Sequence, residues 1–154
     1  MTLLIDTNVI LDIIEKREPF FQDSFSALQQ ATVLKQKILF SASSVKDVFY
    51  LVKRHSGSIE IANSALTKLL SLVQICDTSA DDVKTARTYS IVDFEDAVLT
   101  ATAVREKADY IISRNVKDFT NFHINVISPT DYISMIADFE KKGKNANEQR
   151  TINK

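Results

Sequence analysis

Short apolar runs alternate with longer segments of helical periodicity along this chain of 154 residues. The runs are rich in Ile, Leu, Val and Phe and are bounded by polar or turn-forming residues, which is typical of buried strands. They cover residues 2–6, 37–42, 73–76, 108–113 and 124–128. Strands that alternate with helices predict an α/β layer fold around a mostly parallel sheet.

The segments between these runs carry apolar residues at three- and four-residue spacing, which predicts helices. The helices are expected from Val9 to Pro19, from Phe21 to Val33, from Ser43 or Ser44 to Val52, over 59–72, from the "TSADD" stretch to about Tyr89, from Asp93 to Val104, and from Pro129 onward. The chain is polar and basic from Lys141. We therefore expect one domain over 1–140 and a flexible tail over 141–154.

The charge distribution limits how this chain meets a phosphate-bearing partner. The net charge is −1, so there is no global positive field to attract nucleic acid. The last fourteen residues hold five basic residues and one acid, which leaves a net charge of −5 on residues 1–140. A partner with phosphates therefore requires local basic patches or a bridging metal ion. Only Gly57 and Gly143 occur, which excludes a glycine-rich phosphate loop.

The single cysteine, Cys76, excludes an internal disulfide and fits a reducing cytoplasm. The N-terminus shows no basic segment followed by an apolar core, so no signal peptide is expected. No apolar run reaches the length that spans a membrane. These features together predict a cytoplasmic protein without a membrane partner.

Four aspartates follow predicted strands or open the helices after them. They are Asp6, Asp47, Asp96 and Asp118. In open α/β sheets, ligands bind beyond the carboxyl ends of the strands, and a parallel sheet gathers those ends at one edge. Oxygen-rich sets of carboxylates suit Mg²⁺ or Mn²⁺, which activate water and stabilise the charge on a phosphodiester under attack.

Three of these acids also fit an ordinary helix-capping role. The matching pairs are Ser44 with Asp47, Asp93 with Asp96, and Asn115 with Asp118. Asp6 fits that role least well, because Thr7 or Asn8 can cap the following helix without it. A carboxylate at the end of a buried strand costs desolvation energy unless a partner compensates it, and a divalent cation does so.

Three stretches resemble the motifs of the PIN domain family: "LLIDTNVILD", "DFEDAVLTATA" and "DYIISRNVKDF". Their order and spacing match as well, and the resemblance covers residues 2–135. It is closest to the bacterial branch that includes the VapC-type toxins of toxin–antitoxin pairs. The resemblance implies a parallel sheet of five strands flanked by helices, a metal-dependent ribonuclease activity, and a small antitoxin protein as inhibitor.

The resemblance also implies roles for individual residues. Asp6 matches the first metal-binding acid, and Asp96 matches the acid that opens the helix before the alanine-rich run. Asp118 matches the outer acid, with Asn115 as the alternative. Ser113 matches the hydroxyl residue that supports the first acid, and Asn8 matches a polar residue beside that acid. The second acid departs from the pattern, since most of the family has Glu where Asp47 stands. Asp93 is an accessory acid or a helix cap, and capping is favoured.

Other side chains have competing interpretations. Lys46, Lys53, Arg54, Arg114 and Lys117 are candidates for RNA phosphates, although scattered surface cations are normal. The aromatics Phe20, Phe21, Phe25, Phe49 and Tyr50 are expected in core or dimer contacts rather than in base stacking. His55 and His123 lie in no nucleophile motif, and Cys76 is expected to be a small core residue.

Two classes of function remain open from the sequence. The first is a Mg²⁺- or Mn²⁺-dependent endoribonuclease acting on single-stranded or structured RNA, as the toxin of a toxin–antitoxin pair and with a homodimer allowed. The second is a non-catalytic PIN-fold interaction module or a receiver-like metal-binding domain. Asp6 stands without an acidic neighbour and the 108–113 strand ends in Ser113 rather than Lys, which disfavours a receiver.

Overall fold

The computed structural model is built on a five-stranded parallel sheet with the strand order β3-β2-β1-β4-β5. The strands are β1 (Thr2–Ile5), β2 (Lys37–Ser41), β3 (Gln74–Cys76), β4 (Tyr110–Ile112) and β5 (Asn125–Ile127). The structure describes residues 1–89, 93–119 and 124–152, and only the backbone of 143–152. The α/β fold and the five predicted strands are confirmed.

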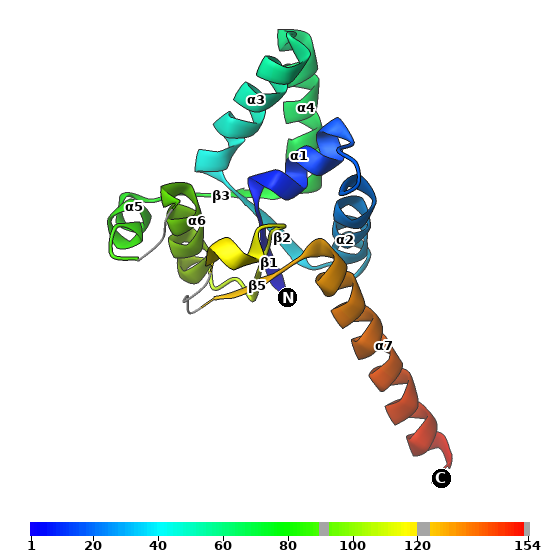
Figure 1. Cartoon of the computed structure of the whole chain (residues 1–154). Helices are drawn as coiled ribbons and strands as arrows, with labels where there is room; N and C mark the ends of the chain where they lie inside the picture. The colour runs from blue at the N-terminus through cyan, green and yellow to red at the C-terminus, as the bar shows by residue number, and fades with distance from the viewer. Residues whose placement is uncertain (90–92, 120–123, 153–154) are drawn as a thin grey trace.

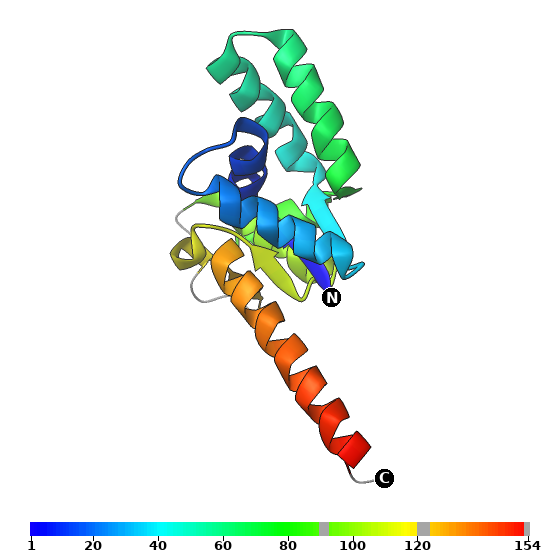
Figure 2. The ribbon, with the colours of Figure 1, turned by 90° about the vertical axis from the view of Figure 1, so that its right-hand side faces the viewer.

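The helices cover both faces of the sheet in three layers (Figures 1 and 2). They are α1 (Thr7–Glu15), α2 (Phe21–Val33), α3 (Ala42–Ser56), α4 (Ile59–Leu72), α5 (Ala80–Ala86), α6 (Phe94–Arg105) and α7 (Pro129–Ile152), with a 3-10 turn at Val116–Phe119. One core joins α1–α4 and α7 to one face, and a smaller core joins α6 to the other. In β1, Leu3 and Ile5 belong to the first core and Leu4 to the second, as the alternation of a buried strand requires.

Strand β1 lies in the middle of the sheet because the chain first adds β2 and β3 on one side and then returns to add β4 and β5 on the other. The switch in direction therefore falls between β1 and β4, where Ile5 pairs with Ile112. The backbone N–H of Asp6 donates to the Ile112 carbonyl at 3.0 Å, which extends this pairing by one residue. Open α/β sheets bind ligands at such a point.

Several helix boundaries differ from the expectation: α1 ends at Glu15 rather than Pro19, and α3 reaches Ser56 rather than Val52. Helix α3 begins directly after Ser41, so Ser43 and Ser44 lie inside it, and Ser44 is buried. The Ser41 hydroxyl bonds to Ser43 and Thr78 instead of capping the helix. Helix α7 continues through Ile152 with no break at Lys141, and it runs beyond the body of the domain in Figures 1 and 2. The division at residue 140 and the flexibility of the tail stay predictions.

An ion-pair clamp fixes α5 against α6, the helix that carries Asp96. Asp82 completes a capping box with Ser79, and both of its carboxylate oxygens lie 3.0 Å from Nε of Arg105. Burial by itself raises the pKa of Asp82, but the bonds from Arg105 and Ser79 outweigh it and hold the pKa below its usual value. The clamp therefore stabilises the folded state.

Replacing Asp82 by Ala should lower the free energy of unfolding by about 2 kcal/mol, because it removes a helix cap and a charge-assisted hydrogen bond from a buried position. Denaturant unfolding at neutral pH measures the change. Asp81→Ala, on the same turn but exposed, is the matched control and should change stability by less than about 0.5 kcal/mol. Equal losses in the two variants would contradict a specific clamp.

Candidate active site

Asp6 lies at the carboxyl end of β1, directly at the switch between β1 and β4. It occupies the N-cap position of α1, yet its side chain caps no backbone N–H and is only 7% exposed. Its Oδ2 accepts hydrogen bonds from the Ser113 hydroxyl at 2.6 Å and from the Asn8 amide at 2.6 Å. The buried carboxylate is therefore held in one orientation by two donors from different segments.

Asn8 and Ser113 are themselves fixed by the loop after β4. The Asn8 amide nitrogen also reaches the Ser113 hydroxyl at 3.3 Å, and its Oδ1 accepts from the backbone N–H of Arg114 at 3.3 Å. The backbone N–H of Asn115 donates to the Ser113 hydroxyl at 3.0 Å. Asn115 thus enters this network through its main chain.

Asp96 is half-buried at the first turn of α6, and its pKa rises to about 7. The largest cause is burial, which disfavours the charged form. The negative charges that raise it further are those of Asp6, Asp93, Asp118 and Glu95. The fold therefore brings Asp6, Asp96 and Asp118 into one electrostatic cluster, although they come from three separate strand ends or helix starts.

Asp47 joins the cluster from α3 through a different neighbour. Its carboxylate pairs with Nζ of Lys46 at 2.7 Å, and its charge raises the pKa of Glu95 after the larger effect of burial. Asp6 also raises the pKa of Glu95. Sequence reasoning missed Glu95, because "DFEDA" holds three acids and the motif directs attention to the other two.

The capping alternatives have different outcomes. Asp93 is the N-cap of α6 and accepts from the backbone N–H of Glu95 at 2.8 Å, which agrees with the favoured capping role. The Ser44–Asp47 pairing is wrong, because Ser44 lies within α3 rather than at its start. The backbone N–H of Asp118 bonds to the Asn115 carbonyl at 2.9 Å, which forms a turn.

Arg114 is less available to phosphate than its sequence position suggests. Its Nε lies 2.9 Å from Oδ2 of the fully buried Asp12, an ion pair whose angle is not that of a hydrogen bond. Burial raises the pKa of Asp12, while Arg114, the Ser24 hydroxyl and Arg17 lower it. Sequence reasoning also missed this pair, since Asp12 follows an apolar helical pattern and nothing local indicates its partner.

Among the remaining described candidates, Lys117 lies next to the acidic cluster and the others lie in other parts of the fold. Lys117 is exposed beside Asp118, whereas Lys53 and Arg54 lie in the last turn of α3. His55 bonds to Glu15 at 2.9 Å, and His123 lies outside the described residues. Cys76 is buried, and burial raises its pKa to about 11, which leaves it a protonated core residue at neutral pH.

The donor set fits a hydrated hard cation. Among the residues that the structure describes, no three Asp, Glu, His or Cys side chains lie close enough to hold one ion together. Mg²⁺ usually keeps several waters and is bound by one or two carboxylates, so a full protein cage is unnecessary. Burial raises the pKa values of Asp96 and Glu95 most, and the neighbouring acids raise them further. A divalent ion at this edge would offset that negative charge.

A parallel sheet with the buried Asp6 at its switch point and further acids near it marks an α/β domain with an acidic site. The PIN domain model matches residues 2–117, and this chain belongs to the PIN domain family. No curated protein matches it. Within the described residues, no helix is long and apolar enough to cross a membrane.

Solved structures of toxin–antitoxin proteins share the fold. A chain of VapBC2 from Rickettsia felis, bound to a fragment of its promoter, is 20% identical with a TM-score of 0.68, over 83% of this chain and 98% of that one. VapBC from Salmonella typhimurium, bound to DNA, is 14% identical with a TM-score of 0.67, over 84% and 98%. VapC20 of Mycobacterium tuberculosis, described as a toxin that cleaves the sarcin-ricin loop, is 15% identical with a TM-score of 0.58, over 71% and 87%.

The elevated pKa of Asp96 predicts a pH-dependent stability in metal-free protein. Between about pH 4 and pH 7 the folded state keeps a proton that the unfolded state has released, so the free energy of unfolding should fall as pH rises. Asp96→Asn should remove this part of the slope, and Asp81→Asn should keep it. Denaturant unfolding in a chelator at several pH values is the measurement, and identical slopes for wild type and Asp96→Asn would contradict the assignment.

Proposed function

We propose that this protein is a metal-dependent endoribonuclease and the toxin of a toxin–antitoxin pair. The observation that carries the proposal is Asp6, held buried by Ser113 and Asn8 at the switch point, beside Asp96 with a pKa near 7. Membership of the PIN domain family supports a nuclease, and the similar fold of VapC20 supports RNA as the substrate.

The acids divide the work according to their surroundings. Asp6 and Asp96 would hold the principal ion, and Asp118 and Asp47 would complete or orient the site. Glu95 is a further acid at the same edge. Bound Mg²⁺ or Mn²⁺ supplies a lowered pKa for the attacking water and compensates charge on the phosphate. A carboxylate of the cluster that does not bind the ion directly would accept the proton from that water. Ser113 and Asn8 keep Asp6 in the orientation that binding needs.

The alternatives predict different arrangements. A non-catalytic PIN module has no reason to retain Asp6, Asp96 and Asp118 in one electrostatic cluster, because their mutual repulsion costs stability. A receiver domain needs a lysine at a strand end in the site, and here Ser113 occupies the end of β4. In a metal-dependent nuclease, a bound divalent ion would offset the repulsion among these aspartates. We place the activity on cytoplasmic RNA.

Asp6→Asn and Asp96→Asn should each reduce RNA cleavage by at least about a hundredfold, because each removes a charge that faces the ion with little change of shape. Asp93→Asn should cleave nearly as wild type, since Asn caps a helix about as well as Asp. Asp47→Glu should keep or raise the affinity for metal. The measurement is cleavage of single-stranded RNA by antitoxin-free protein as Mn²⁺ is titrated.

A thermal melt gives the matching control without catalysis. Millimolar Mn²⁺ should raise the Tm of wild type by mass action, and Asp6→Asn should lose most of that shift. If wild type, Asp6→Asn and Asp96→Asn cleave RNA equally fast, the cleavage comes from a contaminating nuclease and the proposed function is contradicted. Wild-type protein whose Tm ignores Mn²⁺ would count against the metal site itself.

The partner surface in this proposal is an apolar groove between α1, α2 and α4. It has a volume of about 270 Å³ and is lined mainly by Ile13, Phe25, Leu28, Val33 and Leu72. Phe25, Val33 and Leu72 are exposed although they are apolar. Exposed apolar surface of this kind marks interaction sites, and the fold neighbours include toxin–antitoxin complexes. We assign the groove to an amphipathic helix of the antitoxin.

Phe25→Ser should weaken binding of the proposed antitoxin by at least about tenfold, because it removes an aromatic anchor that the complex would bury. Tyr50→Ser, at an exposed aromatic on α3 outside the groove, should bind as wild type. Isothermal titration with the two purified proteins measures both. If Phe25→Ser instead abolishes self-association with no change in that binding, the groove is a dimer interface.

A further inference from the structure

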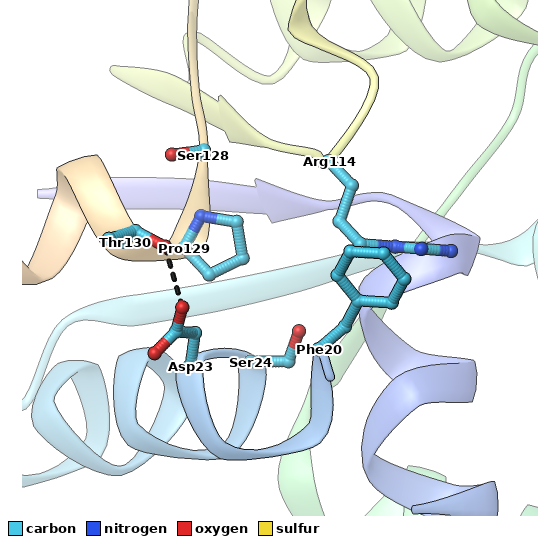
Figure 3. A pocket seen from close by; sticks show the side chains of 7 residues that line it. All are labelled: Phe20, Asp23, Ser24, Arg114, Ser128, Pro129 and Thr130. Atoms are coloured by element: carbon cyan, nitrogen blue, oxygen red, sulfur yellow. Dashed lines mark hydrogen bonds between the residues drawn. The ribbon is translucent and has the colours of Figure 1, made fainter. Parts of the chain in front are cut away.

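A small pocket opens between the starts of α2 and α7, and Arg114 after β4 forms part of its wall (Figure 3). Its volume is about 170 Å³. Its walls include Phe20 and Asp23 at the start of α2, Pro129 and Thr130 at the start of α7, and Arg114 after β4. The pocket is too small for a whole nucleotide-sized ligand but large enough for one flat ring system.

Arg114 connects this pocket to the acids. The preceding residue, Ser113, donates to the Asp6 carboxylate, and the backbone N–H of Arg114 donates to Asn8. The Arg114 side chain then runs into the pocket wall, as Figure 3 shows. A chain of nucleotides whose phosphate lies at Asp6 therefore has this pocket within reach of a neighbouring base.

The surfaces of the pocket suit a planar, mainly apolar ligand. Phe20 is 42% exposed and lines the pocket, so it is not a core residue, and the expected dimer contact stays a prediction. The Arg114 guanidinium carbon lies 4.1 Å from the centre of the Phe20 ring. Pro129 lies on the opposite side of the pocket from Phe20 in Figure 3. Unstacked RNA bases are commonly held by aromatic rings and arginine planes.

The charges at the pocket favour a neutral ligand over a phosphate. Arg114 is already paired with the buried Asp12, so its positive charge is compensated. Asp23 lies in the first turn of α2 with a carboxylate at the pocket wall, which repels an anion. A base is uncharged at neutral pH and meets neither obstacle.

Asp23 gives the pocket a means of choosing among bases. Its Oδ2 accepts from the Thr130 hydroxyl at 2.7 Å, and a carboxylate has lone pairs for further N–H donors. The Watson–Crick edge of guanine presents a ring N–H and an amino group side by side, which matches a carboxylate in two places. Adenine, cytosine and uracil each offer only one of these donors.

We propose that the pocket formed by Phe20, Asp23, Arg114 and Pro129 binds one unstacked base of the RNA substrate next to the cleaved bond, with guanine preferred. The inference rests on the proposed ribonuclease function and adds the feature that sets its sequence preference. In this proposal the acidic site cleaves the RNA, and the pocket determines which base lies next to the cleaved bond.

Cleavage mapping on a random-sequence RNA pool with Mn²⁺ tests the preference. Wild type should enrich guanine at one fixed position beside the cleaved bond. Asp23→Asn should reduce that enrichment about tenfold, because the carboxylate accepts from both guanine donors and the amide cannot. Phe20→Leu should raise KM about tenfold with little change in kcat. Wild-type cleavage with no base enriched at any fixed position would overturn the pocket assignment and leave the nuclease intact.

Two exposed residues provide matched controls for these substitutions. Phe139→Leu changes an aromatic on α7 that is more exposed than Phe20, and Asp81→Asn changes an exposed aspartate on α5. Both variants should keep the wild-type base enrichment and KM. Loss of enrichment in the controls as well would show a general effect on folding and overturn the specific roles of Phe20 and Asp23.

Binding without metal separates this inference from the proposed function. Asp6→Asn protein in a chelator is titrated with short RNA oligonucleotides that differ only in one central base. The guanine-containing oligonucleotide should bind about tenfold more tightly than the others, and Phe20→Leu added to Asp6→Asn should remove the difference. Equal affinities for all four oligonucleotides would overturn the pocket, even if cleavage by wild type had already failed or succeeded.

Discussion

The hydrogen bond from the Ser113 hydroxyl to the Asp6 carboxylate is the contact on which the candidate site depends. It joins the residue after β4 to the residue after β1, so it exists only because these strands are parallel neighbours in register. The chain leaves the two strands in opposite directions along the sheet, and this opens the crevice in which a ligand binds. Burial makes the contact strong, because the carboxylate has lost most of its water.

The acidic edge is stable as a structure but incomplete as an electrostatic system. Two hydrogen bonds hold Asp6, yet burial still raises its pKa. Burial and the acids around it raise the pKa of Asp96 to about 7. A divalent ion would offset the repulsion among carboxylates in a partly buried crevice, and its two positive charges would offset more of it than one proton does. This repulsion costs folding energy in the metal-free protein, and in the proposed nuclease a divalent ion would offset it.

The arginine next to the site, Arg114, makes contacts within the fold that stabilise the structure. Arg114 lies at the same strand end as Ser113, yet its guanidinium is shared between the buried Asp12 and the Phe20 ring. This tie holds the start of α2 against the loop after β4, and it shapes the pocket that we assign to a base. RNA held through a ring stack and an ion needs little basic surface, which agrees with a net charge of −1.

The local periodicity of the sequence determined the α/β class, all five strands and the type of nearly every helix, since burial of strands and helix faces follows from side-chain spacing. Three motifs determined the family and placed Asp6, Asp96, Asp118, Asn8 and Ser113 as candidates. The exact start of α3 was missed because several serines in a row are equivalent as caps until the chain packs. Only the tertiary structure decided that Glu95 joins the acids, that Asp12 engages Arg114, and that Phe20 faces solvent beside the site. These are contacts between segments far apart in the chain, and the geometry that creates them is set by the parallel order of the strands rather than by any local pattern.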